Sequence, residues 1–200
     1  VVPGFVNANP RGIYSIAGFI NDYGAWMADN PAGEIDWWPL NNSSCLRSAL
    51  LAHDKWLANG LSAGDQLLLA VAAEGHKVFL EPAARLAHFN IERALPWFDE
   101  RWVAGVLIAR HRSAQWRLGK RLIYMLASPL IGFVLFSRFL RGVGRRRKPL
   151  GISAWTLPII LAGCVLQGFG EMLGYSRAGG GQRSDRRMTR YEIHKLRYVS

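Results

Sequence analysis

Two long stretches without a charged residue restrict the possible folds of this chain more than any other feature. Residues 122–137 form the first stretch, of 16 residues, and residues 149–170 form the second, of 22 residues. As helices they would be roughly 24 Å and roughly 33 Å long at ~1.5 Å per residue, and only the second comfortably crosses a hydrocarbon layer of ~30 Å. A chain of 200 residues cannot enclose both in a water-soluble core. We therefore predict that these stretches contact a membrane.

Charge is divided unevenly between the two halves of the chain. Residues 1–100 contain 6 lysines and arginines against 11 acidic residues, whereas residues 101–200 contain 19 against 3. Basic residues precede the first uncharged stretch, separate the two stretches and follow the second. The positive-inside rule cannot place the middle basic segment opposite two equally basic neighbours. We therefore predict that the first stretch, with Pro129 and Arg138, lies in the membrane interface or enters and returns. If both stretches do so, every basic segment stays at the anionic cytoplasmic leaflet.

The first half of the chain has the patterns of short strands and amphipathic helices. We predict a strand at residues 1–5, an amphipathic helix at residues 13–27 and a short aromatic strand at residues 35–40. Ser43 or Ser44 would then cap a helix whose leucines share one face. After residue 88 the pattern predicts a helix that runs to about residue 112.

The rest of the chain is arranged around the segment of residues 64–90. It opens with Asp65 ahead of an apolar run with helical spacing. Gly75 is suited to end that helix, because glycine adopts the left-handed conformation readily. Two short apolar segments follow, split by Pro82, and we predict that the second is a strand ending at His88. An acid at a helix N-terminus and a histidine at a strand end are both placed to face a cleft.

The order of these features resembles the second half of the catalytic domain of family 2 glycosyltransferases, which have the GT-A fold. The matching pattern is an acid, a helix, Gly-His-Lys, aliphatic residues and Pro-Ala-Ala-Arg-Leu-Ala-His. Upstream, EIDWWPLNNSSCLRSALL resembles the segment that these enzymes place under the sugar acceptor. Downstream, FDERWVAGVLIAR resembles their arginine-bearing helix after the cleft. The resemblance covers residues 1–112 and implies an α/β fold, a partial GT-A (Rossmann-like) domain followed by membrane-associated helices.

Three regions are therefore expected. Residues 1–115 would be the acceptor-side half of a GT-A catalytic domain, residues 116–176 the hydrophobic membrane-associated helices, and residues 177–200 a basic tail. The tail is compatible with a surface helix or with disorder.

Asp65 is the predicted catalytic residue. Inverting sugar transfer needs a carboxylate that takes the proton from the attacking hydroxyl, and the resemblance gives this role to the acid at this position. The family usually has a Glu-Asp pair here, whereas this chain has Gly64 before Asp65. The alternative is an acid that stabilises the first turn of a helix.

His88 and Arg101 are implied by the resemblance to lie near the donor. His88 would be a ligand of the divalent metal, and Arg101, followed by Trp102, would bind the diphosphate through its guanidinium fork. The glutamines that precede the arginine in the family are absent. The alternatives are a hydrogen-bonded structural histidine and a solvent-facing arginine.

Trp37, Trp38, Asn41 and Asn42 are the predicted acceptor-binding residues. Aromatic faces stack on sugar C–H groups, and amides recognise hydroxyls. A buried aromatic strand followed by an Asx turn explains the same residues equally well.

The nucleotide-binding half of the family is not represented in this sequence. Its metal-binding Asp-x-Asp signature does not occur here, and VVPGFVNANPRG resembles the family's segment directly after that signature. We therefore expect a divalent metal (Mg or Mn) to come with a missing N-terminal half, and the chain to be inactive alone.

The predicted function is transfer of a sugar from a nucleotide-sugar donor to a glycan or lipid acceptor at the cytoplasmic face of the inner membrane. A non-catalytic membrane scaffold or assembly subunit that keeps the half-fold is the alternative. Nucleic acid is not an expected partner, because the basic residues flank apolar stretches and form no aromatic-interleaved patch. The two cysteines, Cys45 and Cys164, provide no disulfide framework, which fits a reducing compartment.

Overall fold

The computed structural model describes residues 1–36, 39, 42–54, 67, 70–143, 152–176 and 181–199. These residues form a small mixed β-sheet and a larger set of helices, so the α/β class is confirmed. The chain divides into two compact units. The sheet unit consists of Val1–Val6 with Tyr23–His88, and the helical unit consists of Asn7–Asp22 with Phe89–Ser200. The predicted limits at residues 115 and 176 stay predictions.

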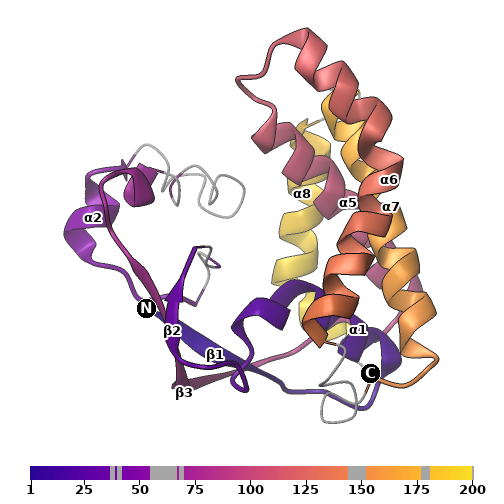
Figure 1. The fold of residues 1–200 in the computed structure, drawn as a ribbon. Helices are drawn as coiled ribbons and strands as arrows, with labels where there is room; N and C mark the ends of the chain where they lie inside the picture. Colours follow the sequence, from indigo (N-terminus) through magenta and orange to yellow (C-terminus); the bar gives the residue numbers. More distant parts are fainter. Residues whose placement is uncertain are drawn as a thin grey trace. The chain divides into compact units, whose positions relative to one another are not determined.

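The sheet unit is built on three strands in the order β1-β3-β2 (Figure 1). They are β1 (Val2–Asn7), β2 (Gly33–Ile35) and β3 (Val78–His88). β2 pairs with β3 in antiparallel register, with Glu34 opposite Phe79. Val2 and Phe5 of β1 and Leu80 of β3 are buried and form part of the core.

β3 is a single strand, although two segments split by Pro82 were predicted. The proline is accommodated because Gly4 of β1 lets the two backbones approach closely. A Cβ atom on Gly4 would lie 2.9 Å from both the Cα and the carbonyl oxygen of Pro82. Next to the proline, the Ala83 amide donates to the Glu81 carboxylate at 3.0 Å. The strand therefore continues to His88, where the sequence predicted that it would end.

Two helix ends in the sheet unit were predicted from the sequence, one at Gly75 and one at Ser43 or Ser44. The left-handed Gly75 is confirmed, with φ of 83° and a hydrogen bond from its amide to the Ala72 carbonyl. The serine cap is wrong: α2 (Arg47–Leu51) begins after Leu46 and has no side-chain cap. Ser43 instead donates its hydroxyl to the Pro39 carbonyl.

The helical unit contains the other helices. They are α1 (Ile13–Tyr23), which continues as the 3₁₀ segment η1 (Gly24–Trp26) in the sheet unit, α5 (Ala94–Arg112), α6 (Leu118–Val143), α7 (Thr156–Ser176), α8 (Gly181–Ile193) and the 3₁₀ segment η3 (Lys195–Tyr198). The helix predicted to run to about residue 112 is confirmed by α5. The basic tail forms α8 and η3 in its described part, so a surface helix is the observed alternative.

α7 lies between α5 and α6 (Figure 1). It runs parallel to α5, because Trp97 near the start of α5 reaches Gly163, and Gly105 further along reaches Gly170. It runs antiparallel to α6, because a Cβ on Gly168 would lie 2.7 Å from the Ser128 carbonyl, and a Cβ on Gly132, further along α6, would lie 2.8 Å from the carbonyl of the earlier Cys164. Glycines at these contacts let the helix backbones approach one another closely.

α6 is longer than the uncharged stretch that predicted it. Its 26 residues correspond to ~39 Å and include Pro129, so the chain does not turn back within this stretch. Among the described residues, Leu118–Arg141 and Thr156–Ser176 are long and apolar enough to cross a membrane by length and composition alone.

Candidate functional site

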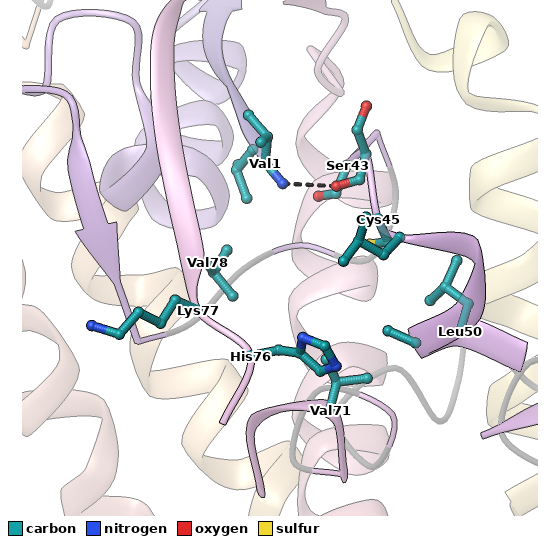
Figure 2. A pocket seen from close by; sticks show the side chains of 12 residues that line it. Val1, Ser43, Cys45, Leu50, Val71, His76, Lys77 and Val78 are labelled. Carbon is teal, nitrogen blue, oxygen red and sulfur yellow. Dashed lines mark hydrogen bonds between the residues drawn. The ribbon is translucent and has the colours of Figure 1, made fainter. Parts of the chain in front are cut away.

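A cavity of about 350 Å³ in the sheet unit is lined by Val1 and Val2, by part of the segment predicted to lie under the acceptor and by part of the segment around the Gly-His-Lys motif (Figure 2). The first of these segments follows the predicted acceptor residues, and the second begins at Val71, inside the helix that Asp65 was predicted to open. The side chains of both include Ser43, Cys45, Leu50, Val71, His76 and Val78. The volume lies within the range of small-molecule sites, which combine an apolar lining with a few polar groups.

Cys45, His76 and Lys77 were not singled out from the sequence as site residues, although they line this cavity. His76 and Lys77 belong to the Gly-His-Lys element of the motif, which was the available signal. The ammonium group of Lys77 forms an ion pair with the Glu34 carboxylate of β2, at a distance of 2.8 Å. This hydrogen bond and the charge of Glu34 raise the pKa of Lys77. His76, whose Nε2 atom lies 3.7 Å from the Glu74 carboxylate, and Cys45 also bring polar side chains to the lining.

Asn42 is the one predicted acceptor-binding residue among the residues that the structure describes. Asn42 is an exposed turn residue with φ of 65°, a left-handed conformation that asparagine adopts more readily than most residues. This geometry is typical of the turn alternative. Trp37, Trp38, Asn41 and Asp65 lie outside the described residues. Their roles in acceptor binding and catalysis stay predictions.

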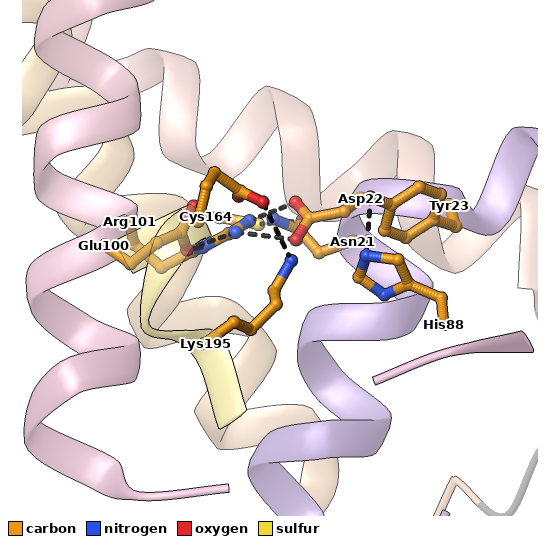
Figure 3. Close-up of polar contacts among 9 residues, drawn as sticks. Asn21, Asp22, Tyr23, His88, Glu100, Arg101, Cys164 and Lys195 are labelled. Carbon is orange, nitrogen blue, oxygen red and sulfur yellow. Dashed lines mark hydrogen bonds and ion pairs between the residues drawn. The ribbon is translucent and has the colours of Figure 1, made fainter. Parts of the chain in front are cut away.

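His88 ends β3 in aromatic surroundings. Its Nε2 atom and the Tyr23 hydroxyl lie 2.9 Å apart, and the two ring centres are 4.2 Å apart (Figure 3). Phe5 lies edge-on to the same imidazole, with its ring centre 6.4 Å away. No three His, Cys, Asp or Glu side chains of the described residues could together hold a metal ion. The hydrogen bond to Tyr23 is the contact expected of a structural histidine, and the metal role of His88 stays a prediction.

Arg101 of α5 is 3 % exposed and is bound by two carboxylates of the helical unit (Figure 3). Its Nη1 and Nη2 atoms donate to the two carboxylate oxygens of Asp22 at 2.5 and 2.7 Å. Its Nε atom donates to Glu100 at 2.6 Å. Burial lowers the pKa of Arg101, but the charges of Asp22 and Glu100 outweigh burial and raise it. All three nitrogens have carboxylate partners, so diphosphate binding by Arg101 stays a prediction that requires these pairs to open.

No model of a known protein family, no curated protein and no solved structure matches this chain. Its function is therefore inferred from the motifs and from the geometry described above.

Glu100, one of the two acidic partners of Arg101, has a pKa near neutrality. Burial raises the pKa of Glu100 from 4.5 to about 7. The positive charge of Arg101 opposes this rise, the negative charge of Asp22 adds to it, and the positive charge of Lys195 in η3 opposes it. Three elements, α1, α5 and η3, thus contribute charge around one carboxyl group.

Glu100 should make the stability of the folded protein depend on pH. Its folded pKa exceeds its unfolded value, so the folded state binds more protons between about pH 4.5 and about 7, and stability falls as the pH rises through this window. The loss is on the order of a few kcal/mol, at about 1.4 kcal/mol per pH unit. We expect Glu100→Gln to remove this part of the pH dependence in chemical denaturation at pH 5 and pH 8. An unchanged difference between the two pH values would contradict the assignment.

Proposed function

We propose that this chain is the acceptor-side part of a membrane-associated inverting glycosyltransferase similar to family 2. The observation that carries the proposal is the cavity of about 350 Å³ shared by the two motif segments. Ser43–Leu50 comes from the stretch that resembles the acceptor platform, and Val71–Val78 comes from the stretch that resembles the catalytic motif. The left-handed Gly75 and the strand ending at His88 support the same assignment, since both were expected from the motif.

In the proposed reaction an acceptor hydroxyl attacks the anomeric carbon of a nucleotide sugar. Asp65 takes the proton of this hydroxyl as the new C–O bond forms. The bond between the anomeric carbon and the phosphate oxygen breaks, and its electron pair leaves with the nucleoside diphosphate. Attack opposite to the leaving group inverts the anomeric centre. The donor would be held by a nucleotide-binding half outside this sequence, together with a divalent metal that supplies charge to the diphosphate.

The acceptor is proposed to be a glycan or a lipid at the cytoplasmic face of the inner membrane. Support comes from α6, whose exposed side chains are mostly apolar, including Leu122, Leu126 and Leu130. A soluble monomer rarely exposes such a continuous apolar surface. A membrane location would give the protein access to lipid-linked acceptors.

Replacing Asp65 by asparagine tests the catalytic assignment. In membranes that contain the complete protein, we expect Asp65→Asn to lower transfer of radiolabelled sugar to lipid or glycan at least 100-fold, because general base catalysis contributes typically 10²–10⁴-fold. Asp54→Asn, an exposed carboxylate of the same unit, serves as the matched control and should keep wild-type activity. Full activity of Asp65→Asn would exclude the base role.

A non-catalytic scaffold is the second candidate, and the surroundings of Arg101 favour it. A guanidinium held by Asp22 and Glu100 stabilises the helical unit without any phosphate. Under this alternative, Asp65→Asn and the wild type would both lack transfer while remaining folded and membrane-bound.

A further inference from the structure

The middle of α7 lies level with a group of charged residues on its neighbour α5. Trp97 of α5 packs against Gly163, and Gly105 of α5 packs against Gly170. Residues 99–101 of α5 therefore lie beside the central part of the 21-residue α7. This level contains Asp99, Glu100 and Arg101, and Asp22 is paired with Arg101 there. If α7 crossed a bilayer, these charges would lie near its midplane.

α8 packs against α5 and adds more charged residues at the same level. It runs antiparallel to α5, since Arg187 and Tyr191 both contact the Asp99 carboxylate and the Glu92 amide donates to the Tyr198 carbonyl at 2.9 Å. Further arginines of α8 and η3 are exposed; they are Arg183, Arg186, Arg190 and Arg197. Exposed arginine side chains are costly in the hydrocarbon core of a bilayer, so they place this level outside it.

α6 has the opposite character. Only Ser128 and Gly132 are buried in its charge-free part, both at the contact with α7. Its exposed large apolar residues are Leu118, Leu122, Ile123, Tyr124, Leu126, Leu130, Phe133, Val134 and Leu140. Lys120, Arg138 and Arg141 flank this apolar surface and are exposed. Apolar side chains between basic ends fit the interface of an anionic membrane, where long basic side chains reach the headgroups.

We propose that the helical unit binds one leaflet of an anionic membrane through α6 and that neither α6 nor α7 crosses the bilayer. The helices lie in the sequence of contacts α6, α7, α5, α8, so α6 is at the lipid end of the row and α8 is at the aqueous end. α6 lies lengthwise in the interface, and its basic ends contact acidic headgroups. This mode keeps both ends of both apolar helices on one side of the membrane. It does not depend on sugar transfer.

Single cysteines test the topology in the full-length protein. Gln115 before α6, Trp155 before α7 and Ser176 at the end of α7 are exposed positions for substitution by cysteine. Cys45→Ser removes the exposed native thiol, whereas Cys164 is buried and can remain. We expect a membrane-impermeant maleimide to label all three from the cytoplasmic side only, in inverted vesicles and not in intact cells. Labelling of Trp155→Cys from the opposite side, or from neither side, would overturn the proposal.

Matched leucine pairs test which end of the row of helices contacts lipid. Leu126 and Leu130 of α6 are 75 % and 65 % exposed, and Leu95 of α5 and Leu196 of η3 are 83 % and 71 % exposed. We expect the pair Leu126→Glu with Leu130→Glu to weaken flotation with phosphatidylglycerol vesicles at least tenfold. The pair Leu95→Glu with Leu196→Glu should change it less than twofold, and both variants should keep the wild-type circular dichroism.

Two results in the flotation experiment would contradict the proposal. One is flotation that survives the α6 pair, and the other is flotation lost with the Leu95 and Leu196 pair. Equal binding to phosphatidylcholine and phosphatidylglycerol vesicles would remove the part of the proposal that concerns acidic headgroups. Neither experiment uses a sugar donor, so its outcome is separate from that of the Asp65 test.

Discussion

Replacing Arg101 by methionine is expected to destabilise the folded protein by about 3–5 kcal/mol, which is the usual cost of removing one partner from a buried ion pair. The guanidinium is 3 % exposed and holds Asp22 and Glu100 together. Methionine keeps much of the volume but leaves two carboxylates without their cation. Chemical denaturation at pH 8 measures the effect, because Glu100 is largely ionised there.

Arg93→Met is the matched control for Arg101→Met. Arg93 is exposed and makes no side-chain cap at the start of α5, so this change should alter stability by less than about 0.5 kcal/mol. The double variant Arg101→Met with Asp22→Asn should recover part of the loss, since it removes one orphaned charge. A loss below about 1 kcal/mol for Arg101→Met would show that the buried pairs are not a main source of stability.

Gly105→Ala should destabilise the contact between α5 and α7 by about 1–3 kcal/mol through overpacking, despite the higher helix propensity of alanine. An added Cβ at this position would lie 3.0 Å from the Glu171 amide nitrogen and even closer to the Gln167 carbonyl oxygen. Both obstacles are backbone atoms of α7, so only a shift of a whole helix relieves the clash. Thermal unfolding in detergent or lipid measures the change.

Gly119→Ala is the control for this substitution. Gly119 is also helical, in the first turn of α6, but a Cβ there has no neighbour within 4 Å. We expect its stability to be equal to or slightly above that of the wild type. Equal effects of the two substitutions would mean that α5 and α7 do not pack as closely as described.

The parts of the fold that follow from local sequence were predictable. A glycine after a helical run predicted the left-handed Gly75, and uncharged apolar stretches predicted α6 and α7. One prediction failed where another part of the chain determines the result. Pro82 does not split β3, because Gly4, far away in sequence, leaves room for it. The serine cap failed for a local reason, because α2 begins only after Leu46, three residues beyond Ser43.

The same reasoning explains what was missed in the candidate site. Arg101 and Asp22 are 79 residues apart in the sequence, so no local pattern indicates their pairing. Without that partner, a phosphate is a natural expectation for an arginine that follows this motif. The cavity was likewise not predictable, because Cys45 and His76, which line it together, lie 31 residues apart in the sequence. Local motifs indicated which segments matter, while the contacts of individual side chains required the tertiary structure.

The helices also show why apolar length alone does not define topology. α7 has the length of a membrane span, yet α5 places Glu100 and Arg101 beside its centre. α6 has few buried residues and a surface that suits lipid. The distinction depends on what each helix packs against, which hydropathy does not report.

The most direct test of the central claim is the release of nucleoside diphosphate from nucleotide sugars. The complete reading frame that encloses these residues should be expressed in membranes and supplied with a panel of donors, a divalent metal and a lipid extract as acceptor source. Release with at least one donor, dependent on the acceptor, is the expected result. No release with any donor, from protein shown to be folded and membrane-bound, would contradict a role in sugar transfer.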